Sequence, residues 1–271
     1  MPSPLVSILV PVYNVEAYIE RCARSAFEQT YQQLEFVFVD DATPDASIDV
    51  LQQVIADYPE RRDSIQIVHH ATNRGLAAAR NTAIASCHGD FVMHVDSDDW
   101  LEPEAAELLI KRQQATDADI VYTRGNYLEH QGTVKIDCRD WSTDRELLLT
   151  NILQDKATMC IWSKLIRRRL YTDHHIRCDE RGSYYEDYQA LSQLVYYAKT
   201  IALLDAYIYH YDRANPNSIV TKALNSTAIQ QQGLRSIQWV YDFFQANDPR
   251  YLEHVKVFRN SFLQRYPQQN T

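Results

Sequence analysis

The stretch that decides the fold is residues 89–103, with the sequence GDFVMHVDSDDWLEP. Residues 91–95 form a mostly apolar run of strand length, which stops at the polar residues 96–99. In an open α/β sheet, ligands bind outside the carboxyl ends of the strands, so acids placed there face a binding crevice. A divalent cation with oxygen ligands would relieve the repulsion between three close carboxylates. The alternative is a turn that caps the next helix, because Asp is a favoured cap and Pro103 suits a first helical turn.

The size and charge of the chain limit the classes of function. Its 271 residues can bury a sizeable core, as one large domain or two small ones. Lys and Arg number 27 against 36 Asp and Glu, so the formal net charge is −9. Acidic residues are scattered along the chain, which argues against a nucleic-acid partner but leaves a nucleotide ligand open.

The sequence also bears on the cellular compartment. We find no run of about 18 apolar residues that would span a membrane, and the N-terminal stretch lacks the basic start and cleavage site of a signal peptide. The five cysteines are widely spaced and form no CxxC pair, which favours reduced, buried thiols. We therefore expect a cytoplasmic protein.

Apolar runs and helical patterns alternate in the first half of the chain. Strands are predicted at 5–12, 34–39, 65–69 and 91–95, and helices follow them at about 15–29, 45–58, 76–86 and 103–115. Such alternation with short connections predicts right-handed crossovers. The fold class is therefore α/β, with a mostly parallel central sheet flanked by helices.

The second half has a looser pattern. We expect a strand at 120–123, a hairpin at 127–136 around Gln131 and Gly132, a helix at 144–152 and a helix that begins near Asp187. A strand at 201–211 would place Tyr207, Tyr209 and Tyr211 on one face. The segment 227–265 is predicted to be helical, with a break at Pro249.

Three of the predicted strands end in polar residues. Tyr13 and Asn14 follow the first strand, Asp40 and Asp41 the second, and residues 96–99 the fourth. One polar strand end is common, whereas three on the same edge of a sheet suggest a nucleotide site.

These strand ends resemble the motifs of the family-2 glycosyltransferases, which have the GT-A fold. The matching stretches are SILVPVYN at 7–14, VFVDDATPD at 37–45, NRGLAAARNTAI at 73–84 and the opening stretch at 89–103. The second half is similar to the family more weakly, in the W-x-K-L stretch at 162–168, the acidic pair Glu186 and Asp187, and the polar loop at 213–218.

The resemblance implies a nucleotide-sugar donor, usually a UDP-sugar. Tyr13 would lie against the base, Asp41 would accept the uracil imide hydrogen and Asp96 would reach the ribose. A second assignment stays open, in which Asp40 contacts the base and Asp41 forms a turn. The residues that we expect around the donor are Pro11, Tyr13, Asp40, Asp41, Arg80, Asp96, Ser97 and Arg213.

The resemblance also implies a metal and a base. Asp98 would bind Mn²⁺ or Mg²⁺ at the diphosphate, whereas Asp99 would cap or brace the loop. Asp187 would be the base that accepts the proton of the attacking hydroxyl, supported by Glu186. One base without a protein nucleophile implies inversion at the anomeric carbon.

Each of two arginines has two possible roles. The head of Arg80 should reach a carboxylate near the donor, either as a structural ion pair or as a ligand contact. Arg213 would either hold the diphosphate or lie free on the surface.

We expect three segments in one GT-A arrangement: a nucleotide-sugar-binding half at 1–105, an acceptor-binding and catalytic half at 106–225, and a helical segment at 226–271. The acceptor would be a glycan or a lipid-linked sugar. Aromatic residues of the last segment, among them Trp239, Phe243, Phe244, Phe258 and Phe262, would either rest on a membrane or pack against the domain or a second subunit. Two alternatives to transfer are sugar-1-phosphate nucleotidyl transfer and an inactive domain that binds a nucleotide or glycan.

Overall fold

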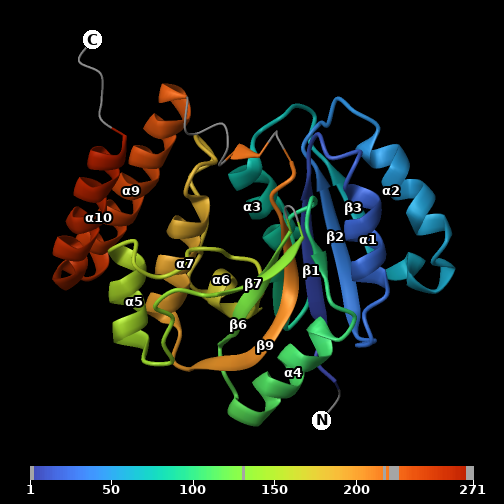
Figure 1. The fold of residues 1–271 in the computed structure, drawn as a ribbon, viewed down its shortest axis with the longest axis horizontal. Coiled ribbons are helices and arrows are strands. Elements are labelled where there is room, and N and C mark those ends of the chain that lie inside the picture. Colours follow the sequence, from blue (N-terminus) through green and yellow to red (C-terminus); the bar gives the residue numbers. More distant parts are fainter. Residues whose placement is uncertain (1–2, 130–131, 216–217, 220–225, 267–271) are drawn as a thin grey trace.

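One curled sheet runs through the protein, and helices cover its faces (Figure 1). The computed structural model describes residues 3–129, 132–215, 218–219 and 226–266. Its nine described strands have the order β3-β2-β1-β4-β8-β6-β9-β5, and β7 pairs with β6 outside this path. The strands are β1 (Val6–Val12), β2 (Leu34–Asp40), β3 (Ile65–His69), β4 (Phe91–His94), β5 (Trp100–Leu101), β6 (Ile120–Glu129), β7 (Thr133–Asp137), β8 (Lys164–Arg167) and β9 (Ile201–Asp212).

The helices confirm most of the expected helical segments. They are α1 (Ile19–Phe27), α2 (Ser47–Ala56), α3 (Leu76–Ser86), α4 (Ala105–Thr116), α5 (Arg145–Leu153), α6 (Arg169–Asp173), α7 (Glu186–Tyr197), α9 (Thr227–Asn247) and α10 (Leu252–Arg265), with short 3₁₀ turns η1 (Pro59–Ser64) and η2 (Pro249–Tyr251). Pro249 stands where the long C-terminal helical segment breaks, as its fixed φ and missing N–H predict.

The first half forms the parallel sheet that the sequence predicts. Strands β3, β2, β1 and β4 pair in parallel, and every residue of β1 is buried. Its side chains alternate between two cores: Leu9 packs with α3, whereas Ile8 and Val10 pack with α1 and α2. Because both faces of β1, β2 and β4 are covered, these three strands are mostly apolar runs, and polar residues gather at their ends.

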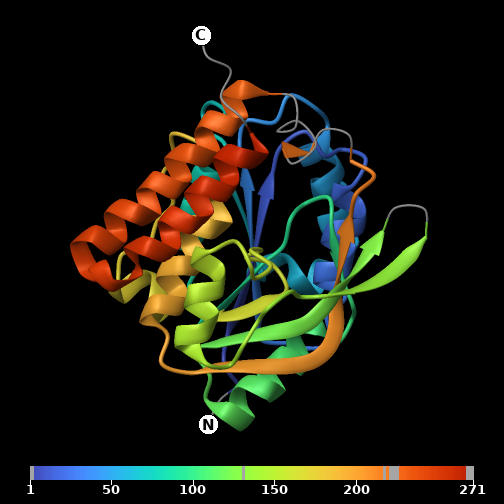
Figure 2. The same ribbon diagram turned by 60° about the vertical axis from the view of Figure 1, so that its left-hand side comes forward.

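The second half extends the sheet with mixed pairing. Strand β8 runs antiparallel between β4 and β6, and β9 pairs in parallel with β6. Strand β5 pairs antiparallel with β9, which places Trp100 opposite His210. The hairpin of β6 and β7 projects from the body of the molecule (Figure 2); the expected turn residue Gln131 lies outside the described residues.

The prediction that three tyrosines of β9 share one face is wrong for Tyr207. The register between β6 and β9 shifts near this residue, and the irregularity breaks the alternation of side chains. Tyr209 and Tyr211 stack on Trp162, whereas the Tyr207 ring lies against Tyr127.

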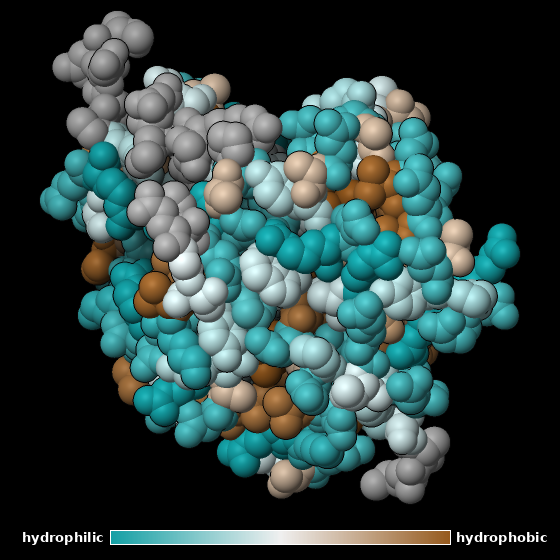
Figure 3. All heavy atoms as spheres, turned by 45° about the vertical axis from the view of Figure 1, so that its right-hand side comes forward, coloured by the Kyte–Doolittle hydropathy of each residue, from teal (hydrophilic) through white to brown (hydrophobic). Residues whose placement is uncertain are grey.

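The C-terminal helices α9 and α10 lie side by side and complete the core around α5 and α7 (Figures 1 and 2). Phe244, Phe258 and Phe262 are fully buried there. These three rings therefore pack against the domain, which is one of the two roles that we expected. On the face shown in Figure 3, the described residues are mostly hydrophilic and hydrophobic ones form small, separate patches. Among the described helices, none combines the length and the apolar character needed to cross a membrane.

Candidate active site

The polar strand ends meet at one edge of the sheet, because β1, β2 and β4 are parallel. Leu9 of β1 pairs with His94, and Val12 pairs with Asp40, so the residues after these positions leave the sheet together. Pro11 is buried within β1, whereas Tyr13 just beyond it is 46% exposed. An exposed aromatic ring beside the buried Asp41 is suited to stack on a flat ligand.

Asp41 fastens the end of β2 to the loop before α3. Its carboxylate accepts hydrogen bonds from the backbone N–H groups of Arg74 at 2.8 Å and Gly75 at 2.7 Å, and it contacts Nδ1 of His70 at 2.7 Å. Gly75 has a φ of 88°, which favours glycine at this position. Asp40 instead accepts from the backbone N–H of Thr43 at 2.9 Å. Asp40 therefore forms a turn contact, whereas the residue of this pair that contacts the base stays a prediction.

Asp99 braces the acidic loop from inside. It is fully buried, and it accepts hydrogen bonds from the Tyr209 hydroxyl at 2.7 Å and from the Asp212 backbone N–H at 2.8 Å. This confirms the expected bracing role, and β9 supplies both donors. Ser97 is also buried, so the loop turns inward there.

Asp98 keeps a more accessible carboxylate than Asp99. One of its oxygens accepts from Nδ2 of Asn215 at 2.8 Å. Burial, together with the nearby charges of Asp96 and Asp212, raises the pKa of Asp98 to about 6. A cation bound here would favour the charged form of Asp98. Residues 216–217 of the polar loop 213–218 lie outside the described residues.

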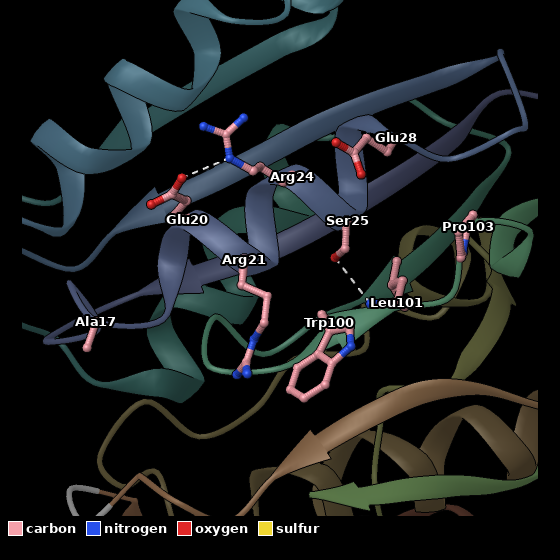
Figure 4. A pocket seen from close by; sticks show the side chains of 9 residues that line it. All are labelled: Ala17, Glu20, Arg21, Arg24, Ser25, Glu28, Trp100, Leu101 and Pro103. Carbon is pink, nitrogen blue, oxygen red and sulfur yellow. Dashed lines mark hydrogen bonds and ion pairs between the residues drawn. The ribbon is translucent and has the colours of Figure 1, made fainter. Parts of the chain in front are cut away.

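A stack of flat side chains supports the acidic loop from the solvent side. The guanidinium of Arg21 donates to the Asp98 carbonyl at 3.0 Å and lies 3.6 Å from the Trp100 ring centre (Figure 4). His210 stacks on the same Trp100, at 4.6 Å, and on Tyr127, at 4.4 Å. No predicted site residue lines the hollow of about 510 Å³ that Figure 4 shows beside this stack.

Arg80 joins the two halves of the site. From α3 its guanidinium donates to Asp96 at 2.7 Å and to Asp187, and it lies 3.2 Å from Glu186. The expected contact between Arg80 and a carboxylate is thus confirmed, with two acids of the second half beyond Asp96. Asp187 also accepts from the backbone N–H of Ile161 at 3.1 Å.

Desolvation shifts the pKa values of the acidic pair, in which Glu186 is buried and Asp187 is partly buried. Glu186 and Asp187 begin helix α7, directly after Tyr185, which adopts the left-handed backbone conformation. Burial raises the pKa of Glu186 to about 8, and it also raises the pKa of Asp187, while the charge of Arg80 opposes both shifts. One guanidinium thus faces three carboxylates, so the cluster holds Glu186 in its protonated form near pH 7.

A pocket of about 570 Å³ lies over this cluster. Arg80, Asp96, Glu186, Asp187 and Arg213 all line it. The remaining lining is rich in aromatic rings, which are Tyr127, Trp162, Tyr184, Tyr185, Tyr211 and Tyr266. The structure therefore brings these five predicted residues around one cavity, whereas Tyr13, Asp41 and Asp98 are not among its lining residues.

Sequence reasoning missed several residues of this region. His94 interrupts the apolar run 91–95, and that interruption was a usable signal, because its side chain is buried beneath the site. Arg21 and His70 had no such signal, since single polar residues in a helix or loop show no pattern. Their roles depend on contacts between segments far apart in the chain.

Comparison with known sequences identifies the family. The model of the family described as glycosyl transferase family 2 matches residues 7–175. The protein belongs to this family. It is similar to EpsH of Bacillus subtilis (strain 168), which is named as a glycosyltransferase, with 30% identity over 268 residues, 97% of this chain and 75% of that protein. The predicted family and enzyme class are confirmed, and this chain is a glycosyltransferase.

Solved structures confirm the fold of this glycosyltransferase. S. aureus TarS 1-349 in complex with UDP-GlcNAc has a TM-score of 0.66 at 19% identity, covering 97% of this chain and 82% of TarS 1-349. The mannosyltransferase PcManGT from Pyrobaculum calidifontis, in complex with GDP-Man and Mn²⁺, has a TM-score of 0.62 at 17% identity, covering 97% and 72%. The fold is thus the GT-A type that the sequence predicts.

Proposed function

We propose that this glycosyltransferase moves a sugar from a UDP-sugar to a hydroxyl group of a glycan or lipid-linked acceptor, with inversion. The observation that carries the proposal is the Arg80 bridge between Asp96, at the end of a nucleotide-side strand, and Asp187 of the acidic pair. Asp96 and Asp187, which we assign to donor binding and to the base, both line one cavity of about 570 Å³. Such a cavity is in the size range of small-molecule sites.

The residues that we assign to binding the nucleotide-sugar donor lie at the ends of the parallel strands. We assign Tyr13 to stacking on the base, because its ring is exposed beside the buried Asp41. The backbone N–H of Asp41 donates to the Val12 carbonyl at 3.0 Å, which keeps the carboxylate next to the start of the Tyr13 loop. TarS and PcManGT, which share the fold, were solved with a UDP-sugar and a GDP-sugar, and this supports a nucleotide-sugar donor.

The catalytic step is a direct displacement with Asp187 as the base. The acceptor oxygen forms a bond to the anomeric carbon while the bond to the diphosphate breaks, and the diphosphate leaves with the electron pair. The acceptor proton goes to a carboxylate oxygen of Asp187. Glu186 stays protonated at neutral pH, because burial raises its pKa to about 8, so the two acids have different tasks. Since no protein nucleophile takes part, the configuration inverts.

The acidic loop fits a divalent cation. Asp98 is a carboxylate whose charged form is disfavoured by burial and by nearby acids, which a cation would reverse. Within the described part of the chain, no group of three His, Cys, Asp or Glu side chains forms a metal cage. Mg²⁺ typically uses one or two carboxylates with substrate phosphates, so Asp98 suffices on the protein side. When bound, Mn²⁺ or Mg²⁺ would neutralise charge on the leaving diphosphate.

Besides the proposed cation, Arg213 would supply a positive charge at the diphosphate. It is exposed, it lines the same pocket, and its backbone N–H is held by the Glu129 carbonyl at 2.9 Å. We assign its guanidinium to the diphosphate, because an arginine fork matches phosphate oxygens. The aromatic lining suits the apolar faces of sugar rings on the acceptor side.

The test is UDP release from a panel of UDP-sugars and other nucleotide-sugars, with Mn²⁺, with Mg²⁺ and with a chelator. We expect turnover with at least one UDP-sugar, and we expect the chelator and Asp98→Ala to abolish it. Asp242→Ala, on the exposed side of α9, is the matched control and should leave turnover unchanged. Full turnover by Asp98→Ala would contradict the metal assignment, and release from none of the donors would contradict the proposed function.

A further inference from the structure

A small cavity of about 20 Å³ lies behind the acidic pair. Four helices and strands contribute to its lining: α3 with Arg80, β4 with His94, α6 with Tyr171, and the start of α7 with the acidic pair. The rest is mostly apolar, including Ile84, Ile161 and Ile176. The pocket of about 570 Å³ described above shares Arg80, Glu186 and Asp187 with this cavity, so the two spaces meet at this cluster of charged side chains.

Two buried polar atoms on this cavity have no hydrogen-bond partner within the described chain. They are Nε of Arg80 and Nδ1 of His94. The two side chains are 5% and 3% exposed, so bulk water does not reach them. Leaving such a group unsatisfied costs about 1–3 kcal/mol, which makes a partner inside the cavity strongly favoured.

The protonation state of His94 also leaves one hydrogen-bonding group on this cavity without a partner. Burial lowers the pKa of His94 to about 3, so the ring is neutral and carries one N–H. Its Nε2 pairs with the Tyr171 hydroxyl at 3.0 Å. If Nε2 donates, the Tyr171 hydrogen and the Nδ1 lone pair lack partners; if Tyr171 donates, the Nδ1 hydrogen lacks one. Either tautomer therefore leaves an unsatisfied group beside the unsatisfied Nε–H of Arg80.

The size of the cavity decides what the partner is. About 20 Å³ exceeds the 10–15 Å³ or so that one water needs, and it is too small for a larger ligand. We propose that this cavity is a site for one structural water, which accepts a hydrogen bond from Nε of Arg80 and bonds to Nδ1 of His94. His94 and Tyr171 are then positioning residues that act on the catalytic cluster through Arg80.

The water site would fix the guanidinium in place. The Nη atoms of Arg80 already reach Asp96 and Asp187, and the water holds the remaining Nε–H. Strand β4 and the loop after it would thus hold Arg80 at two points. His94 would bind Nε of Arg80 through the water, and Asp96, two residues later, accepts a hydrogen bond from its Nη2. A well-fixed Arg80 favours the charged form of Asp187, which the proposed base needs.

A crystal structure of the full chain at about 1.5 Å resolution tests the water site without any assumption about function. We expect one water at about 2.7–3.2 Å from both Nε of Arg80 and Nδ1 of His94. An empty cavity, or a protein atom as the partner of either nitrogen, would overturn the proposal.

The positioning role rests on the proposed function, and it is tested by the pH profile of kcat/KM. His94→Leu and Tyr171→Phe should move the acidic limb to higher pH by about half a unit or more, because a loosened Arg80 stabilises ionised Asp187 less. Ile176→Val, an apolar change in the same cavity, should leave the limb in place. If either variant folds and lacks the water but its kcat/KM profile keeps the acidic limb at the same pH, the positioning role is refuted.

The two arms separate the possible failures. If the unaltered protein released UDP from no donor while the crystal showed the water, the proposed function would fail and the water site would stand. If turnover were normal but the cavity were empty, the proposed function would stand and the water site would fail.

Discussion

The burial of Glu186 makes a prediction about stability that needs no substrate. The ordinary pKa of a glutamate is 4.5, whereas burial raises that of Glu186 to about 8 in the folded protein. Between these values the folded state holds a proton that the unfolded state has released, so the free energy of unfolding falls as the pH rises. Between the two pKa values, each pH unit lowers the free energy of unfolding by about 1.4 kcal/mol. From pH 4.5 to pH 7 the cost reaches about 3 kcal/mol.

Glu186→Gln should remove this loss of stability, because the amide has a similar shape and does not ionise in this pH range. The variant should match the unaltered protein near pH 4.5, exceed its stability by up to about 3 kcal/mol at pH 7, and keep a constant advantage above pH 8. Urea unfolding followed by tryptophan fluorescence between pH 4.5 and 9 measures this difference. Glu60→Gln, at an exposed position of η1, is the control and should show no such trend. A stability difference that does not change with pH would refute the reasoning.

Three further substitutions test the site and the packing around it. Asp187→Asn should lower kcat by about 10²–10⁴-fold while UDP binding in calorimetry is retained, and undiminished transfer would assign the base to another residue. Tyr209→Phe removes the hydroxyl that donates to Asp99 at 2.7 Å and should lower the free energy of unfolding by about 1–3 kcal/mol in urea, whereas an unchanged midpoint would contradict the bracing role. Gly89→Ala should cost about 1–3 kcal/mol in the same assay, because the new Cβ would lie 2.8 Å from the Ser7 backbone nitrogen; full stability would show that the backbone yields there.

The sequence predicted the parallel half of the fold well, because buried parallel strands are continuous apolar runs. The buried runs at 6–12 and 34–40 were recognised with nearly correct ends, and the edge strand at 65–69, which has no buried residue, was placed at its observed bounds. Strand β9 was harder, since a register shift against β6 separates Tyr207 from Tyr209 and Tyr211. Such an irregularity depends on the partner strand, which no local pattern reveals.

In the candidate site, too, some features could be predicted from the sequence and others could not. Acids at strand ends were visible, because a polar residue at the end of an apolar run is a local signal. The contacts of Arg80 with both Asp96 and Asp187 were only partly foreseen, since 107 positions separate Arg80 from Asp187. The stack of Arg21, Trp100 and His210 could not be predicted, because it forms only when β5 pairs with β9.

The central claim is that a sugar passes directly from a nucleotide to an acceptor hydroxyl with inversion. A proton NMR time course tests it most directly, with the UDP-sugar identified by the donor panel, Mg²⁺ as the cation and a set of short oligosaccharide acceptors. The account predicts that the anomeric signal of the α-linked donor is replaced first by that of a β-linked product. An α-linked first product would contradict it.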